Sequence, residues 1–321
     1  MLLQRLITGW LLFAALSVYA DDYVNHDGVK RFMDELVNEH GFERAYLQAQ
    51  FDQAVRKQNI LDAISRPAEK SKPWKDYRKI FVTDKRINQG KAFLEKYQAD
   101  LQRAEDSYGV PKQIIAAIIG VETYYGRIKG SYRVVDALST LAFDYPPRSK
   151  FFRKQLKEYF LLVREQGFDP LDVKGSYAGA MGYGQFIPSS YRHYAVDFDG
   201  DGVADIINNP IDAIGSVANY FKMHGWKTGA PVVSKARVAE THNDELANSG
   251  LKPKVSVGEI RKQGFTPRAD YADDELATLI KLDGKRGLEY WVGLKNFYVI
   301  TRYNHSRMYA MAVYQLSERL R

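Results

Sequence analysis

The stretch PKQIIAAIIGVETYYG, residues 111–126, places an acid at the end of an almost unbroken apolar run. Positions 114 to 119 and position 121 are Ile, Ile, Ala, Ala, Ile, Ile and Val, which leaves no polar face. This pattern predicts a helix that is buried on most sides, with Pro111 in its first turn. A helix of this kind indicates a mostly helical core.

The acid in this stretch is Glu122. A carboxyl group at the end of a buried helix is partly desolvated, which raises its pKa toward the range useful for a general acid near neutral pH. The alternative is a carboxylate that turns to solvent or pairs with Arg127 or Arg133. From the residues alone, both interpretations stay open.

The first twenty residues, MLLQRLITGWLLFAALSVYA, combine Arg5, an apolar run and a small-x-small ending at Ala20. They predict a secretory signal peptide, residues 1–20, cleaved before Asp21. An uncleaved membrane anchor is the alternative, but the apolar run is shorter than the ~20 residues that a spanning helix needs. The chain has no cysteine, so we expect neither disulfides nor a lipoprotein. These features predict a soluble periplasmic protein.

The 321-residue chain carries a formal net charge of +7. A basic surface suits nucleic acid, an anionic membrane or a cell wall that bears carboxylates. Export argues against nucleic acid, and no basic run with interleaved aromatic residues is present. A generally solvated basic surface accounts equally well for most of these charges.

The N-terminal part, residues 21–97, is predicted to be a helical domain, formed as a hairpin or small bundle. Its first helix is expected to stop at Gly41. The stretch SRPAEKSKPWKDYRKIF, residues 65–81, is polar and carries Pro67 and Pro73, which predicts an extended strap rather than a helix.

Three further parts follow. Residues 98–228 alternate helical segments with glycine-rich loops and predict the helical core. Residues 229–293 contain short β-prone runs and predict a small β-rich subdomain, with DGKRG, residues 283–287, as a hairpin connection. Residues 294–321 begin strand-like, become helical at Ser306 and return to the core. The expected fold class is mainly α (α+β).

A glycine-rich stretch, KGSYAGAMGYGQFIPSSY, covers residues 174–191. It lacks the G-x-x-x-x-G-K-[ST] pattern, which excludes a phosphate loop. Glycine at this density lets the backbone approach a packed helix or a ligand closely, and Ser176 and Gln185 then offer hydrogen bonds inside a groove. The chain also lacks G-x-S-x-G and H-E-x-x-H, so serine-hydrolase and zinc chemistry are poorly supported.

The acidic stretch DFDGDGVADIINNPID, residues 197–212, resembles the front half of a calcium loop. Position 12 is Asn208, where the standard loop has a bidentate Glu, and an acidic turn is the alternative. The ligands that fit positions 1, 3, 5 and 7 are Asp197, Asp199, Asp201 and the carbonyl of Val203.

Several stretches, taken together and in order, resemble the lytic murein transglycosylase B family, glycoside hydrolase family 103. They are GVETYYGR, DALSTLAFDYPPR, KGSYAGAMGYGQFIPSSY, DFDGDG with DAIGSVANYFKMHGW, and YVITRYNHSRMYAMAV. The resemblance runs from about Asp22 to the C-terminus and implies a lysozyme-like helical core, a helical N-terminal domain and a small β domain. It also implies cleavage of the β-1,4 bond between N-acetylmuramic acid and N-acetylglucosamine in peptidoglycan, leaving 1,6-anhydromuramic ends.

The resemblance assigns roles to individual residues. By its place in ETYYG, Glu122 corresponds to the single catalytic acid and base. Arg148 belongs to a Y-P-x-R element, where Pro147 stands in place of a second arginine found in some members. The residues implied to line the groove or contact substrate are Tyr77, Arg148, Ser176, Tyr177, Gln185, Tyr220, Tyr303, Asn304 and Tyr309.

The resemblance also extends the acidic loop, because the last ligand in the family is the aspartate before AIGSVANY, which is Asp212 here. It implies a structural calcium ion and no organic cofactor. The expected ligands are Asp197, Asp199, Asp201, the carbonyl of Val203 and Asp212.

Two other functions compete with the transglycosylase reaction. A retaining glycosidase needs two carboxylates about 5 Å apart, so a lysozyme-type muramidase requires a second acid such as Asp136 or Asp144. In a non-catalytic peptidoglycan-binding protein, Glu122 is only structural. The expected partners are peptidoglycan glycan strands, with other cell-wall enzymes as further candidates and no nucleic acid, and we expect a monomer.

Overall fold

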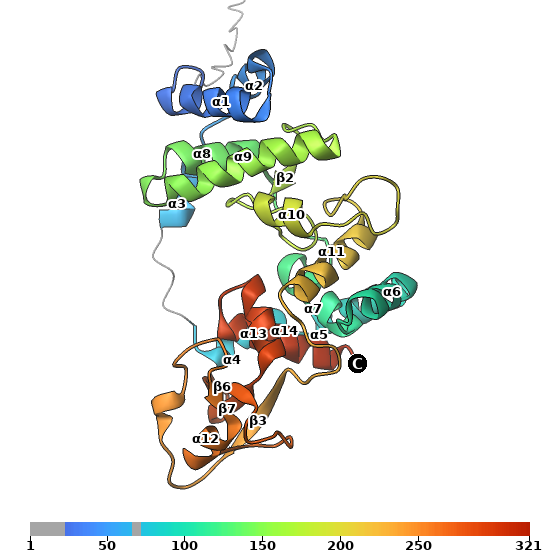
Figure 1. Cartoon of the computed structure of the whole chain (residues 1–321), viewed down its shortest axis with the longest axis vertical. Helices are drawn as coiled ribbons and strands as arrows, with labels where there is room; N and C mark the ends of the chain where they lie inside the picture. The colour runs from blue at the N-terminus through green and yellow to red at the C-terminus, as the bar shows by residue number, and fades with distance from the viewer. Residues whose placement is uncertain (1–22, 66–71) are drawn as a thin grey trace, which may run out of the picture. The chain divides into compact units, whose positions relative to one another are not determined.

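A computed structural model describes residues 23–65 and 72–321, and the chain divides into two compact units after Arg56 (Figure 1). The predicted signal peptide, residues 1–20, lies outside the described residues. The positions predicted as domain boundaries, residues 97, 228 and 293, stay predictions. No helix of the described residues is long and apolar enough to cross a membrane.

The smaller unit contains the helices α1 (Asp27–His40) and α2 (Arg44–Phe51). Nδ1 of His26 caps α1 by accepting a hydrogen bond from the backbone N–H of Gly28. The helix ends at Gly41, whose φ of 65° is left-handed, so the predicted stop is confirmed.

The larger unit, from residue 57 onward, is mainly helical, and helices precede and follow a small sheet. Before the sheet come α3 (Gln58–Ser65), α4 (Trp74–Phe81), α5 (Asp84–Lys96), α6 (Gln98–Tyr108), α7 (Lys112–Thr123), α8 (Val134–Phe143), η1 (Pro146–Arg148), α9 (Ser149–Gln166), α10 (Pro188–Tyr194) and α11 (Pro210–Met223). Within and after it come η2 (Asp244–Leu246), α12 (Val257–Lys262), α13 (Lys295–Tyr303) and α14 (Arg307–Arg319).

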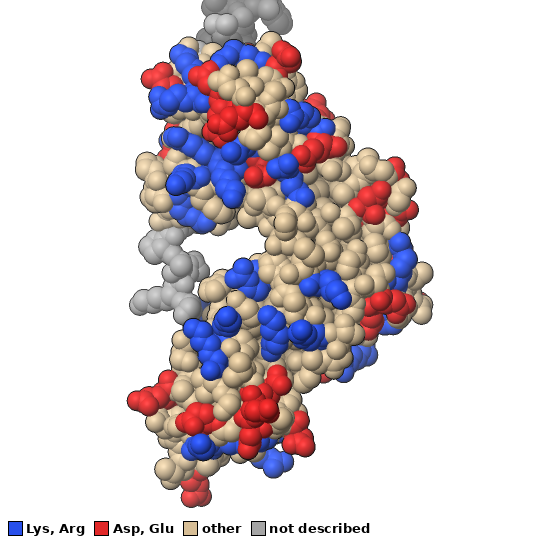
Figure 2. All heavy atoms as spheres, in the orientation of Figure 1, with Lys and Arg blue, Asp and Glu red and all other residues tan. Residues whose placement is uncertain are grey.

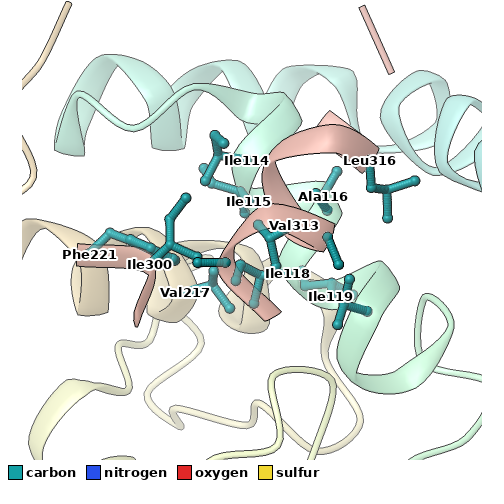
Figure 3. Close-up of a cluster of buried hydrophobic side chains, with 14 of the residues drawn as sticks. Ile114, Ile115, Ala116, Ile118, Ile119, Val217, Phe221, Ile300, Val313 and Leu316 are labelled. Atoms are coloured by element: carbon teal, nitrogen blue, oxygen red, sulfur yellow. The ribbon is translucent and has the colours of Figure 1, made fainter. Parts of the chain in front are cut away.

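Helix α7 occupies the centre of the core, as its sequence predicts. Each residue from Ile114 to Val121 is buried. Pro111 is the N-cap of the helix, one position before its first turn. The apolar side chains of α7 meet those of α11, α13 and α14, including Val217, Ile300 and Val313 (Figure 3). Burial of each large aliphatic side chain contributes about 1.5–3 kcal/mol, so this contact holds the end of α7 in a fixed place.

The sheet has five antiparallel strands in the order β4-β6-β7-β3-β5. The predicted hairpin connection is confirmed, because Gly284 pairs with Gly287 across a two-residue turn. The strands are β3 (Val233–Val238), β4 (Val255–Ser256), β5 (Phe265–Pro267), β6 (Leu276–Gly284) and β7 (Gly287–Gly293). A separate pair, β1 (Tyr132–Arg133) and β2 (Lys174–Gly175), ties the chain after α7 to the glycine-rich stretch.

Two local predictions are wrong. The predicted strap contains the helix α4, because Trp74, Tyr77 and Phe81 lie on one helical face that packs on the core. Pro73 precedes this helix as its N-cap, where a proline is tolerated. The strand-like start of the C-terminal part is the helix α13, since burial of its β-branched residues against the core overrides their strand propensity. The predicted helix start at Ser306 is confirmed, and Ser306 caps α14.

Candidate active site

The end of helix α7 fixes the backbone on which Glu122 lies. Tyr124 and Tyr125 follow with left-handed φ values of 56° and 60°, which terminate the helix. The N–H of Tyr124 returns to the carbonyl of Gly120 at 3.1 Å, and that of Tyr125 to Ile119 at 3.3 Å. Two consecutive non-glycine residues in this region are uncommon, and such strain is concentrated at functional sites.

Thr123 attaches this helix end to the glycine-rich stretch. Its hydroxyl lies 2.9 Å from the carbonyl oxygen of Tyr183 and 3.1 Å from that of Ile119, and it donates to these acceptors. The same oxygen accepts a 2.9 Å hydrogen bond from the N–H of Gly126. The sequence analysis missed Thr123, although it directly follows Glu122, because no pattern marks a threonine as a connection between loops.

Glu122 is partly exposed, but its carboxyl group is surrounded by protein. The hydroxyl of Tyr309 donates a 2.5 Å hydrogen bond to its Oε1. Desolvation raises the pKa of Glu122 to about 7, and the hydrogen bond from Tyr309 opposes this increase. Arg133, one of the alternative ion-pair partners, binds the carboxylate of Asp136 instead, at 2.8 Å.

Tyrosines frame the carboxyl group. Burial, followed by the charge of Glu122, raises the pKa values of Tyr77 and Tyr303, which places both rings within electrostatic reach of that acid. The hydroxyl of Tyr303 donates a 2.6 Å hydrogen bond to the carbonyl of Gly184, in the glycine-rich stretch. Tyr220 packs edge-on against Tyr303, with ring centroids 4.8 Å apart, and donates its hydroxyl to the carbonyl of Arg302. Tyr220 is buried and supports Tyr303 from behind.

The glycine-rich stretch forms tight turns that pack on protein. Ser176 accepts hydrogen bonds from the N–H groups of Ala178 and Ala180. Gln185 has a φ of 51°, and its amide nitrogen donates to the carbonyls of Lys129 and Gly182. These contacts hold the two side chains within the loop.

The remaining predicted groove residues have no contact with Glu122 among the interactions of the described residues. Tyr177 is 42% exposed, and Asn304 is exposed at the end of α13. The guanidinium of Arg148 lies 4.4 Å from the ring centroid of Phe151, at the start of α9. The structure therefore joins Tyr309 to Glu122 by a hydrogen bond, places Tyr77 and Tyr303 within electrostatic reach of that acid, and keeps Arg148 in a separate aromatic contact.

The acidic loop gathers carboxylates next to α11. Oxygen atoms of Asp197, Asp199 and Asp212 lie within 4.8 Å of one another, while Asp201 lies outside this cluster. Asp212 is fully buried, and burial raises its pKa although it accepts hydrogen bonds from three backbone N–H groups. Three converging hard oxygen donors, one of them buried, fit the ligand preference of a calcium ion.

A helical core with a protonatable glutamate at the end of its central helix, framed by tyrosines, defines a lysozyme-like enzyme. Residues 25–318 match the family model described as "Transglycosylase SLT domain". The chain belongs to this family, and it is a lytic transglycosylase that acts on peptidoglycan. The predicted mainly α, lysozyme-like fold class is thereby confirmed.

Individual relatives agree with this assignment. The "Membrane-bound lytic murein transglycosylase B" of Escherichia coli (strain K12) is 45% identical over 306 residues, which cover 92% of this chain and 83% of that protein. The soluble lytic transglycosylase SltB1 from Pseudomonas aeruginosa is 56% identical, with 91% of this chain and 97% of that chain covered and a TM-score of 0.88. The Escherichia coli lytic transglycosylase Slt35, solved in complex with calcium, is 45% identical, with 93% and 94% covered and a TM-score of 0.86.

Proposed function

We propose that Glu122 is both the acid and the base of the transglycosylase reaction, and that the products carry 1,6-anhydromuramic ends. The observation that supports this role is the pKa of about 7, caused by desolvation, of a carboxyl group hydrogen-bonded to Tyr309. A group with this pKa exists in both protonation states near neutral pH, so it can give up a proton and later accept one.

The reaction proceeds in two steps. In the first, protonated Glu122 gives its proton to the glycosidic oxygen as the bond to the anomeric carbon of muramic acid breaks. The 2-acetamido carbonyl oxygen of the same sugar bonds to that carbon. In the second, the Glu122 carboxylate removes the proton of the sugar's 6-hydroxyl, whose oxygen attacks the anomeric carbon and displaces the acetamido oxygen. Glu122 ends protonated, and no water is consumed.

The ion pairs of Asp136 and the surroundings of Glu122 favour this mechanism over hydrolysis by a muramidase. The carboxylate of Asp136 is engaged in ion pairs with Arg133 at 2.8 Å and with Lys57 at 3.7 Å, rather than directed at a substrate. Asp144 is the residue that ends α8. Among the described residues, only burial and Tyr309 shift the pKa of Glu122.

Substrate binding is assigned to the residues around this acid. Tyr77 and Tyr303 offer aromatic surface near Glu122, as the apolar face of a sugar ring requires, and Tyr309 orients the acid through its hydroxyl. The other proposed contacts are Ser176, Tyr177, Gln185, Tyr220, Asn304 and Arg148. The Pseudomonas aeruginosa enzyme SltB3, 31% identical to this chain, was solved in complex with NAG-NAM-pentapeptide, and we infer that this chain likewise binds peptide-bearing glycan strands.

We also propose a structural calcium ion in the acidic loop. Asp197, Asp199 and Asp212 would hold it with their side chains, joined by Asp201 and the carbonyl of Val203. When bound, the ion would neutralise the clustered carboxylates and would hold the loop between α10 and α11 in a fixed conformation. The proposed location is the periplasm, after removal of residues 1–20, and the proposed oligomeric state is a monomer.

Product analysis after the substitution Glu122→Gln tests the catalytic proposal. We expect the wild-type enzyme to release muropeptides with 1,6-anhydro ends from purified sacculi, detected by mass spectrometry, and the folded variant to release none. The matched control, Asp144→Asn, should retain activity. Near wild-type release by Glu122→Gln excludes the proposal, reducing muramic ends indicate a hydrolase, and binding without any product from the wild type indicates a binding protein.

A further inference from the structure

A basic pocket of about 600 Å³ lies where α4, the segment after η2, β6 and the loop between α13 and α14 meet. It continues into a smaller pocket of about 240 Å³, with which it shares His305 and the segment Ser249–Leu251. The basic residue types that line the two pockets are Lys72, Lys252, Lys254, Lys281, His305 and Arg307.

The charge balance of the combined pocket favours an anion. Its acid, Asp283, lies 3.6 Å from Lys75, and the Asp244 carboxylate pairs with Lys281. Lys281 and both acids are thus paired, whereas Lys72, Lys252, Lys254 and Arg307 have no carboxylate partner among the described residues. Figure 2 shows lysine and arginine side chains gathered over α4, α13 and α14, and a group of acidic side chains below them, over the sheet.

Arg307 gives the strongest indication that the pocket binds an anion. It is half-buried, and desolvation lowers its pKa, so the protein disfavours its charge. Its guanidinium donates to the carbonyl of Asn248 at 3.3 Å, and no carboxylate of the described residues pairs with it. Arginine offers five N–H donors in a planar fork that matches a carboxylate, so most of its donor capacity is unused.

The pocket shares two helices with the catalytic centre. The first turn of α14 carries Arg307, which lines the pocket, and Tyr309, which binds Glu122. The first turn of α4 carries Trp74, which lines the pocket, and one turn later comes Tyr77, whose pKa is raised by burial and then by the charge of Glu122. Along both α4 and α14, the residues that line the pocket are therefore within one helical turn of a tyrosine that acts on Glu122.

We propose that this pocket binds a carboxylate of a peptide stem on the glycan strand that is being cleaved at Glu122. The proposal rests on the proposed function, because the stem is attached to the substrate of that reaction. A five-residue peptide spans up to about 17 Å when extended, whereas Trp74 and Tyr77 are only one helical turn, about 5 Å, apart along α4. Besides its cations, the pocket offers apolar surface from Leu251, Leu282 and Met308 for the short side chains of such a peptide.

The peptide stem proposed for this pocket differs from the stem that Arg148 would bind. Arg148 lies at the start of α9, whereas Arg307 starts α14. A glycan strand carries stems on successive muramic acids, so the two arginines can serve different stems of one strand. The enzyme then prefers strands that carry peptides over strands from which an amidase has removed them.

The test compares Arg307→Gln with the control Arg286→Gln, which removes the same charge from the exposed hairpin turn between β6 and β7. We expect Arg307→Gln to lower kcat/KM roughly tenfold on peptide-bearing strands, the usual effect of losing a charged hydrogen bond, and to leave the rate on peptide-free strands unchanged. Arg307→Lys should restore most of the loss, and Arg286→Gln should resemble the wild type on both substrates.

A binding measurement separates carboxylate recognition from other effects. In calorimetric titrations with a synthetic stem pentapeptide, we expect binding by the wild type, weaker binding by Arg307→Gln and weaker binding of the peptide whose carboxyl groups are amidated. Equal loss of activity by Arg307→Gln on both glycan substrates, or equal binding of the two peptides, overturns the proposal. Activity of the wild type on peptide-free strands keeps the proposed function intact in either case.

Discussion

The hydroxyl of Tyr309 donates a hydrogen bond of 2.5 Å to Oε1 of Glu122, although the two residues are 187 positions apart in the chain. Tyr309 lies in the first turn of α14 and Glu122 in the last turn of α7, and these two helices pack against each other in the core. The contact stabilises the ionised carboxylate, whereas burial stabilises the protonated acid. These two opposing effects, the hydrogen bond and the burial, together set the pKa of Glu122.

Tyr309→Phe should raise the pKa of Glu122 further, because it removes the hydrogen bond that favours the charged form and keeps the desolvation. The alkaline limb of the kcat/KM profile should then move to higher pH, since that limb reports loss of the proton from the free enzyme's acid. Tyr159→Phe is the matched control, because the hydroxyl of this buried tyrosine donates to the carbonyl of Pro170 instead. An unchanged limb in Tyr309→Phe would separate this contact from acid catalysis.

Glu122→Gln should change the pH dependence of stability. The pKa of this acid rises from 4.5 to about 7 on folding, so the native state holds its proton more tightly than the unfolded state. The free energy of unfolding of the wild type therefore falls as pH increases from about 4.5 to about 7 and is level above that range. Glutamine does not titrate and does not lose this stability, so the variant should gain on the order of 3 kcal/mol relative to the wild type between pH 4.5 and pH 8.

Urea denaturation at pH 4.5 and pH 8 measures this difference. Glu95→Gln, on the exposed face of α5, is the control and should show no gain that grows with pH. A difference between Glu122→Gln and the wild type that stays constant across this range would contradict the raised pKa.

Thr123→Val should destabilise the end of α7 and reduce kcat. Valine has nearly the same shape but leaves the N–H of Gly126 without its acceptor and the carbonyl of Tyr183 without its donor. Unsatisfied partly buried groups cost about 1–3 kcal/mol. Thr301→Val is the matched control, because this buried threonine only donates to Tyr298 one turn earlier in α13. Equal losses of kcat in the two variants would show that Thr123 has no special role in placing Glu122.

Removal of calcium should lower the melting temperature by a few degrees, because an ion that binds only the folded state stabilises it by mass action. Differential scanning calorimetry with and without a chelator measures the effect. Asp199→Asn should abolish the response, whereas Asp169→Asn, in a turn after α9, should retain it. A melting temperature that does not respond to chelator in the wild type would exclude the calcium site.

Much of the fold was predictable because local patterns and packing agree. The apolar run from Ile114 to Val121 has no polar face, and α7 is buried all round. The turn at Gly284 and Gly287 closes the hairpin that its sequence predicts. Prediction failed where a short segment carries conflicting signals. In residues 65–81, two prolines and many charges predict an extended chain, but the three aromatic residues of α4 lie at helical spacing and pack on the core.

The site was predictable mainly through the resemblance to a known family. Glu122 and Tyr309 were both named, whereas Thr123 and Arg307 were missed, because a threonine or an arginine acquires a role only from what lies beside it. Tyr220 was expected in the cleft. Its burial behind Tyr303 results from the contact between α11 and α13, which no local sequence pattern encodes.

The sequence by itself determined that a buried apolar helix ends in a carboxyl group and that an acidic, glycine-rich loop and a small β-rich part follow. Local spacing is enough for such statements, since it reflects backbone geometry and the burial of apolar surface. Only the tertiary structure decided the chemical state of Glu122. Its pKa depends on how much water the packed helices exclude and on the hydrogen bond from the hydroxyl of Tyr309 in α14. Both effects require segments that are far apart in the chain to lie close together in space.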